Sequence, residues 1–263
     1  MNNRENKLLT IDEIDGMTSI GSPHKKELRE IGDKISPILR KLDNATIEEF
    51  AESVIGGKIE NIGVGEDWTM TKELYPEVKI HMAYTYYGEE FVDNEIDGVK
   101  FLFSGERIKW ITGEDLASFV DLTANYQKRA LQNRKVSEKD TSEQSNMLKT
   151  AIMVRYDPFY FLEDDDIPII IDFIGGTFVK EKEWMNMYKQ IYPGVTLLIK
   201  FAEDHSIEPR IIGDNSYFLE NYEKDIIKIL VINHILRYIT IRFDERDLPE
   251  ICVKMFPKGY FKK

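Results

Sequence analysis

The first half of the chain contains Gly56-Gly57, Trp68 and Tyr75-Pro76-Glu77-Val78, in that order, and this succession decides how the fold is interpreted. It recurs in the second half as Gly175-Gly176, Trp184 and Tyr192-Pro193-Gly194-Val195. From residue 56 to 175, from 68 to 184 and from 75 to 192, the offsets are 119, 116 and 117 residues. Nearly constant offsets are typical of a duplicated domain with small loop insertions. We therefore expect two related domains.

Each copy is expected to form a short helix, a Trp-bearing segment, an alternating strand, a hairpin, a further strand and a long helix. Period-two alternation predicts strands at 78–86 and 195–201. A double glycine ends a helix cheaply, because glycine accepts the left-handed conformation. The β-branched stretch 167–174 favours a strand on propensity, but its place in the repeat and Pro168 in the first turn favour a helix, which we adopt. The predicted class is α+β, each domain with a mainly antiparallel sheet and one long helix.

Composition shifts along the chain suggest four parts. Residues 1–22 are polar and are expected to form a loose N-terminal arm, followed by a first repeat domain at 23–135. The polar, aperiodic stretch 136–149 is expected to be a linker. The second repeat domain is then 150–263, opening with a strand or hairpin at 151–162 and a helical turn or two around Trp184. Alternation at 238–243 and 251–255 predicts two extra C-terminal strands.

Charge and cysteine content limit the function classes. With a net charge of −12 over 263 residues, the surface should repel nucleic acid. A single cysteine excludes an internal disulfide and any site that needs several thiolates from this chain. No stretch approaches the roughly 18 apolar residues that a membrane span needs, and the N-terminus lacks a signal-peptide core. We expect a cytoplasmic protein without a membrane partner.

The order of elements resembles the duplicated α/β domain of a family of unassigned function, found mainly in anaerobic bacteria and archaea. The similarity rests on the double glycine, the proline before an alternating strand, the acidic hairpin and the Glu114-Asp115-Leu116 opening of the long helix. The second copy departs from that opening with Glu223-Lys224-Asp225-Ile226. The family has no established catalytic residues, so the resemblance implies a fold and assigns no site.

Aromatic residues of the first copy offer one candidate site. Tyr84, Tyr86, Tyr87 and Trp110 belong to a cluster larger than the core of such a domain requires. Aromatic side chains are enriched where proteins bind partners, so some of these residues are expected to line an interface. Packing in the core is the competing interpretation.

Acidic residues of the second copy offer another candidate site. Glu163 and Asp165 belong to the densest acidic run, and His205 follows Asp204 in the second hairpin. Carboxylate oxygens bind hard cations, and a histidine beside a carboxylate suits acid–base work. An acidic turn at a helix start and a solvated histidine are the simpler interpretations. His81, in the first alternating strand, has no carboxylate beside it in the sequence.

Familiar nucleotide-binding and hydrolase motifs are absent, and the glycine-rich stretch 63–67 lacks the basic residue that a phosphate site would need. We therefore predict no cofactor. The first hypothesis is a non-catalytic binding or accessory protein that engages a protein partner through the surface formed by its two domains. The alternative is a metal-dependent or acid–base enzyme with its site in a cleft between them. Self-association into a homo-oligomer is left open.

Overall fold

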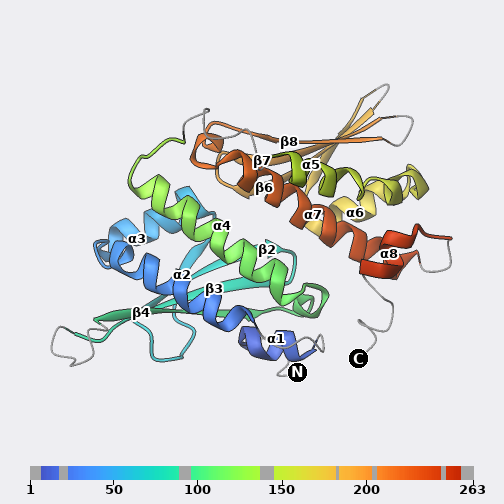
Figure 1. Cartoon of the computed structure of the whole chain (residues 1–263). Helices are drawn as coiled ribbons and strands as arrows, with labels where there is room; N and C mark the ends of the chain where they lie inside the picture. Colours follow the sequence, from blue (N-terminus) through green and yellow to red (C-terminus); the bar gives the residue numbers. More distant parts are fainter. Residues whose placement is uncertain are drawn as a thin grey trace. The chain divides into compact units, whose positions relative to one another are not determined.

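The computed structural model of the protein describes residues 7–17, 23–88, 96–136, 145–181, 184–202, 206–243 and 247–255. The chain divides into two compact units, Met1–Arg134 and Lys135–Lys263, each of which is described by itself. Figure 1 labels their helices and strands. Within the described ranges, no helix combines the length and apolar character needed to cross a bilayer.

The first unit places helices before and after a four-stranded antiparallel sheet of order β1-β2-β3-β4. Its elements are α1 (Ile11–Met17), α2 (His24–Leu39), α3 (Asn44–Phe50) with a π-helical turn (Ala51–Ile55), β1 (Lys58–Glu60), β2 (Trp68–Tyr75), β3 (Val78–Tyr86), β4 (Asp97–Ser104), a 3₁₀ turn (Ile108–Trp110) and α4 (Gly113–Leu131).

The second unit also has a short helix, four strands, a 3₁₀ turn and a long helix in that order, and its antiparallel sheet has the order β5-β6-β7-β8. Its elements are α5 (Ser145–Met153), a 3₁₀ turn (Asp157–Phe161), α6 (Asp166–Ile174), β5 (Thr177–Lys180), β6 (Trp184–Tyr192), β7 (Val195–Ala202), β8 (Ile207–Ile212), a 3₁₀ turn (Ser216–Phe218), α7 (Asn221–Arg242) and α8 (Glu250–Met255). The expected α+β class, with two antiparallel sheets and a long helix in each unit, is confirmed.

The units share details as well as order. Gly56 and Gly175 each end a helix with positive φ angles of 70° and 66°, which glycine adopts without a Cβ penalty. The second strand of each sheet carries a register shift just before its buried tyrosine, Tyr75 or Tyr192. These matches show that the repeated residues serve the architecture: they end a helix, bend a strand and anchor the core.

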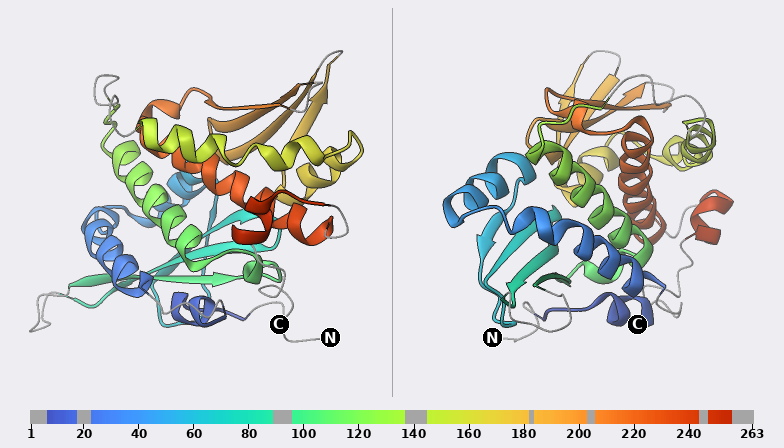
Figure 2. Two further views of the ribbon diagram at one scale, coloured as in Figure 1. Left: turned by 45° about the vertical axis from the view of Figure 1, so that its right-hand side comes forward. Right: turned by 60° about the vertical axis from the view of Figure 1, so that its left-hand side comes forward.

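The core of the first unit lies between its sheet and the helices α2 and α4, which cover the same face (Figure 2). Helix α2 buries a stripe of residues with helical spacing, Leu28, Ile31, Ile35 and Leu39. Its Gly32 approaches β4 so closely that a Cβ would lie 2.7 Å from the carbonyl oxygen of Val99. The opposite face, which we call the polar face, carries Thr71, Lys79, His81 and Ser104 beside the buried Leu102.

Residues 7–17 of the expected N-terminal arm pack on the first unit. The backbone of Leu9 exchanges two hydrogen bonds with Phe103 at the edge of β4. Thr10 and Glu13 cap α1, with the Thr10 N–H donating to the Glu13 carboxylate over 2.8 Å. Ile11 and Ile14 are then buried, and that burial gives these residues a fixed place in the first unit.

Four further expectations about elements are settled by the structure. The helix predicted at 167–174 is confirmed as α6. The strand or hairpin at 151–162 is wrong, because α5 and a 3₁₀ turn occupy that stretch. The helical turn around Trp184 is wrong, because β5 and β7 pair with this segment as strand β6.

The two extra C-terminal strands are also wrong: α7 continues through 238–242 and α8 covers 250–255. Ile232, Ile235, Leu236 and Ile239 are all fully buried, so α7 is surrounded on several sides. An alternating apolar pattern then fits a helix buried all round as well as it fits a strand.

Candidate functional site

The polar face of the first sheet carries an open cavity of about 370 Å³. Strand pairing brings its lining together, since His81 lies opposite Thr71 of β2 and Lys79 lies opposite Ser104 of β4. Lys79 and His81 are two residues apart on β3 and therefore point to the same face. The cavity is lined by Leu8, Lys58, Glu60, Asn61, Ile62, Lys79, His81 and Ser104.

His81 is buried, with 4% of its surface exposed, and both ring nitrogens have hydroxyl partners. Its Nε2 lies 2.7 Å from the Ser104 Oγ, and its Nδ1 lies 2.8 Å from the Thr71 Oγ1. Burial lowers the pKa of His81 below its usual value, although the nearby Glu60 carboxylate raises it. The imidazole is therefore neutral at pH 7, with one nitrogen as donor and one as acceptor.

The number of protons that each group can donate decides which group donates and which accepts in each hydrogen bond of this network. Burial raises the pKa of Glu60, but hydrogen bonds from Lys58 and Thr71 outweigh burial and hold the pKa below its usual value, so the carboxylate is ionised. If Thr71 gives its one hydroxyl proton to Glu60, it accepts from Nδ1–H of His81. Nε2 is then the acceptor and takes its hydrogen bond from Ser104. A chain of hydrogen bonds runs from Ser104 through His81 and Thr71 to Glu60.

The charges around the cavity favour an anionic ligand. Lys58 and Lys79 bring two positive charges, while Glu60 brings one negative charge and is paired with Lys58 over 2.5 Å. With His81 neutral, the lining carries a net charge of +1 in a chain of net charge −12. A locally positive cavity on an acidic protein concentrates anions against the overall field.

The second unit replaces this network with apolar and aromatic residues. The Tyr188–Leu198 pair occupies the place of the Thr71–His81 pair. The Ile212–Thr196 pair occupies the place of the Ser104–Lys79 pair. The same succession of elements therefore forms without the polar network. The His81 network is a property of one unit and is not a requirement of the fold.

The four aromatic candidates do not form one surface. Tyr84 is buried and stacks on Trp68 with ring centroids 4.9 Å apart. Its hydroxyl donates to Asp97 over 3.2 Å, and burial and the Asp97 charge raise the pKa of Tyr84 to about 12. Tyr86 and Tyr87 are 45% and 47% exposed. Trp110 is half-buried in the 3₁₀ turn before α4. Only Tyr86 and Tyr87 are open to a partner.

Tyr87 lines an open cavity of about 460 Å³ at the end of the sheet. The Val64 loop, the β3–β4 end and α2 all contribute to it, and its charged members are Arg29, Asp33, Asp97 and Lys100. Val64 is 42% exposed. The exposed side chains of Val64 and Tyr87 both line this cavity, and we call them the Tyr87 surface.

Two neighbours of the acidic candidates, Asp164 and Asp166, make local contacts. Glu163 and Asp165 are exposed. Asp164 pairs with Lys180 over 3.4 Å, and the Asp166 carboxylate accepts the backbone N–H of Glu163 over 2.8 Å. His205 lies outside the described residues. Among the residues that are described, no three His, Cys, Asp or Glu side chains are placed to hold a metal ion.

The glycine-rich stretch 63–67 forms a nest of backbone N–H groups, and its own carboxylate fills it. Glu66 accepts hydrogen bonds from Ile62, Gly63 and Val64 at 2.5, 3.2 and 2.8 Å. Burial raises the pKa of Glu66, but these backbone donors outweigh it and lower the pKa to about 2. The donors that could hold a phosphate are therefore satisfied within the loop.

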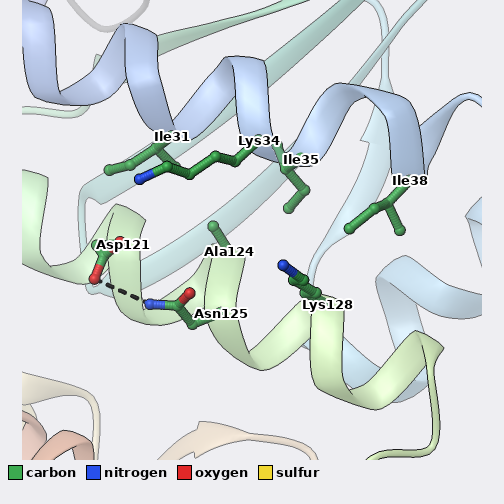
Figure 3. A pocket seen from close by; sticks show the side chains of 8 residues that line it. All are labelled: Ile31, Lys34, Ile35, Ile38, Asp121, Ala124, Asn125 and Lys128. Carbon is green, nitrogen blue, oxygen red and sulfur yellow. Dashed lines mark hydrogen bonds between the residues drawn. The ribbon is translucent and has the colours of Figure 1, made fainter.

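A small cavity of about 40 Å³ lies between α2 and α4 (Figure 3). Asn125 donates to the Asp121 carboxylate over 3.1 Å beside Lys34 and Lys128. Burial, and to a lesser extent the charge of Glu27, raise the pKa of Asp121. The volume suits one or two water molecules and no larger ligand.

Reasoning from the sequence missed the residues that surround His81. Glu60, Thr71 and Ser104 lie 21, 10 and 23 residues away from it, on three other strands. The alternation of β3 could have placed Lys79 and His81 on one face, but the partners depend on strand register. Comparison with family models, curated proteins and solved structures gave no match for this chain. The family resemblance therefore stays a prediction.

Proposed function

We propose that this protein is a binding protein whose first unit takes up a small anionic molecule in the His81 cavity. The supporting observation is the buried network of His81, Thr71 and Ser104, of which His81 and Ser104 line an open cavity, while other residues occupy the corresponding positions of the second unit. A volume of about 370 Å³ lies within the range of small-molecule sites. Lys79 supplies the charge that attracts the ligand.

Calorimetric titration with citrate and with inorganic phosphate tests this proposal. Lys79→Met removes one positive charge from the cavity, and we expect it to weaken binding by at least about tenfold, as loss of a charge-assisted hydrogen bond does. Lys109→Met, at an exposed lysine of the 3₁₀ turn, is the matched control and should bind as the wild type does. Equal affinity of the Lys79→Met variant and the wild type would refute the proposal that the anion binds in this cavity.

A second candidate function is attachment to a protein partner, which the sequence also predicted, in the cytoplasm. The supporting observation is the Tyr87 surface, where the exposed side chains of Val64 and Tyr87 lie beside the charged residues Arg29 and Lys100. Partner surfaces combine aromatic residues with such a polar rim.

Chemical cross-linking of the purified protein in native extract, compared between wild type and a Tyr86→Ser, Tyr87→Ser variant, tests the second candidate. We expect cross-linked species of the wild type to disappear in the variant. Sedimentation of the purified protein alone separates a different partner from a second copy of this chain. Identical cross-linking patterns would count against the Tyr87 surface.

A further inference from the structure

Ser104 and His81 have the geometry of a nucleophile and its general base. Their Oγ and Nε2 atoms are 2.7 Å apart, within the range that proton transfer requires. Both side chains line the open cavity, so a molecule bound there reaches them. We propose that Ser104 is a nucleophile activated by His81, and that the first unit hydrolyses small carboxylic esters. This inference rests on the proposed function only in that the same cavity admits the substrate.

The remaining members of the network position the base. Nδ1 of His81 is held by the Thr71 hydroxyl, and the Glu60 Oε1 lies 3.9 Å from the same nitrogen. In known serine hydrolases a carboxylate on this side of the imidazole fixes the tautomer and stabilises the imidazolium that forms. Here Thr71 stands between the carboxylate and the ring, so Glu60 acts through Thr71 and by its charge. Both are positioning residues.

The reaction balances with water as the only co-reactant. The Ser104 Oγ attacks the ester carbonyl carbon while its proton passes to Nε2 of His81. The tetrahedral intermediate collapses, the ester C–O bond breaks, and the alcohol leaves with the proton from Nε2. Water then gives a proton to Nε2 and attacks the acyl-serine carbonyl. The carboxylic acid is released, and the Ser104 hydroxyl regains its proton.

Lys79 is placed to stabilise the negative oxygen of the intermediate. It is the cross-strand partner of Ser104, and such partners have Cβ atoms about 5 Å apart. Its side chain lines the same cavity as Ser104, as does Asn61. Electrostatic stabilisation of the oxyanion is worth about 100-fold or more in rate when one donor is removed. The substrates that fit are short acyl esters, because the cavity volume is about 370 Å³.

A purely structural role for the pair is the competing interpretation. A buried histidine needs partners for both nitrogens, and two hydroxyl groups satisfy that need. However, the second unit fills the corresponding positions with Tyr188, Leu198 and Ile212, so the fold does not require a polar network there.

Labelling with a fluorophosphonate, followed by mass spectrometry of the intact protein and its peptides, tests the inference. The probe forms a Ser–O–P bond and releases fluoride only at an activated serine. We expect one adduct, on Ser104, and none in Ser104→Ala. Labelling should be at least about 100-fold slower in His81→Gln, because a general base contributes that much. Ser53→Ala, at an exposed serine of the same unit, should label as the wild type does.

Hydrolysis of p-nitrophenyl acetate supplies a second readout. The rate should rise with pH through the His81 pKa, which lies below its usual value, and then level off. Failure of the folded wild type to label, or equal labelling of His81→Gln, would overturn the inference. Citrate binding by Ser104→Ala separates the two proposals, because a variant that binds but is not labelled leaves the cavity's binding role intact. Circular dichroism confirms that each variant is folded.

Discussion

Replacing Glu66 with glutamine tests how the loop between β1 and β2 is held. The carboxylate accepts hydrogen bonds from three backbone N–H groups, and the Thr69 hydroxyl donates to it over 3.2 Å. The side chain is buried, with 8% of the residue exposed. Glutamine keeps the shape and one acceptor oxygen but loses the charge, so the substitution isolates the electrostatic part of the interaction.

The magnitude follows from the pKa of Glu66. Its value falls from 4.5 to about 2 on folding, which corresponds to a stabilisation of at most about 3 kcal/mol at neutral pH. Because glutamine still accepts one hydrogen bond, we expect Glu66→Gln to lower the free energy of unfolding by about 2 kcal/mol. A folded pKa below the unfolded pKa means that the stabilisation is full above pH 4.5 and is lost as the pH falls toward 2.

Urea unfolding followed by tryptophan fluorescence and circular dichroism measures this difference. At pH 7 the variant should be less stable by the full amount, and at pH 3.5 the gap should shrink to roughly a third of that value, because only the wild type loses stability as its carboxylate is protonated. Glu52→Gln, at an exposed glutamate of the same unit, should show no gap at either pH. A Glu66→Gln gap that is independent of pH would refute the charge-based account and assign the effect to packing.

Three further substitutions test local packing and hydrogen bonding in the first unit. Gly105 has a φ of 114°, and a Cβ would lie 2.0 Å from the Glu77 carbonyl oxygen, so Gly105→Ala should cost more than about 2 kcal/mol in chemical denaturation. Gly16→Ala, in α1 with open space around it, should instead stabilise by about 0.5–1 kcal/mol. Lys72 donates from a buried position to the Ile55 carbonyl over 2.6 Å, so Lys72→Met should cost about 1–3 kcal/mol through the unsatisfied carbonyl. Thermal melts of Lys72→Met that match the wild type would refute this role.

Local signals in the sequence determined much of the architecture. Alternation at 78–86 and 195–201 predicts β3 and β7, because a half-buried strand must alternate its two faces. Gly56 and Gly175 predict the ends of helices, because only their φ angles near 70° suit the left-handed turn. The repeat also resolved 167–174 as a helix against its β propensity. The strands and helix ends follow from neighbouring residues, whereas the helix at 167–174 follows from comparison of the two halves of the chain.

Where the sequence failed, the deciding interactions were long-range. The stretch 238–242 alternates like a strand but continues α7, because the helix is packed on several sides and its burial outweighs local propensity. Trp184 belongs to a strand because β5 and β7 supply its hydrogen-bond partners. Neither packing nor pairing partners can be read from the segment itself.

The candidate site depends on the tertiary structure, because its residues come from four different strands. His81 could be placed on a strand from its neighbours, yet Glu60, Thr71 and Ser104 reach it only through the register of four strands. A shift of one residue in any pairing would turn the affected side chains to the other face. The sequence determined which residues carry the chemistry, and strand register alone brought them to one cavity.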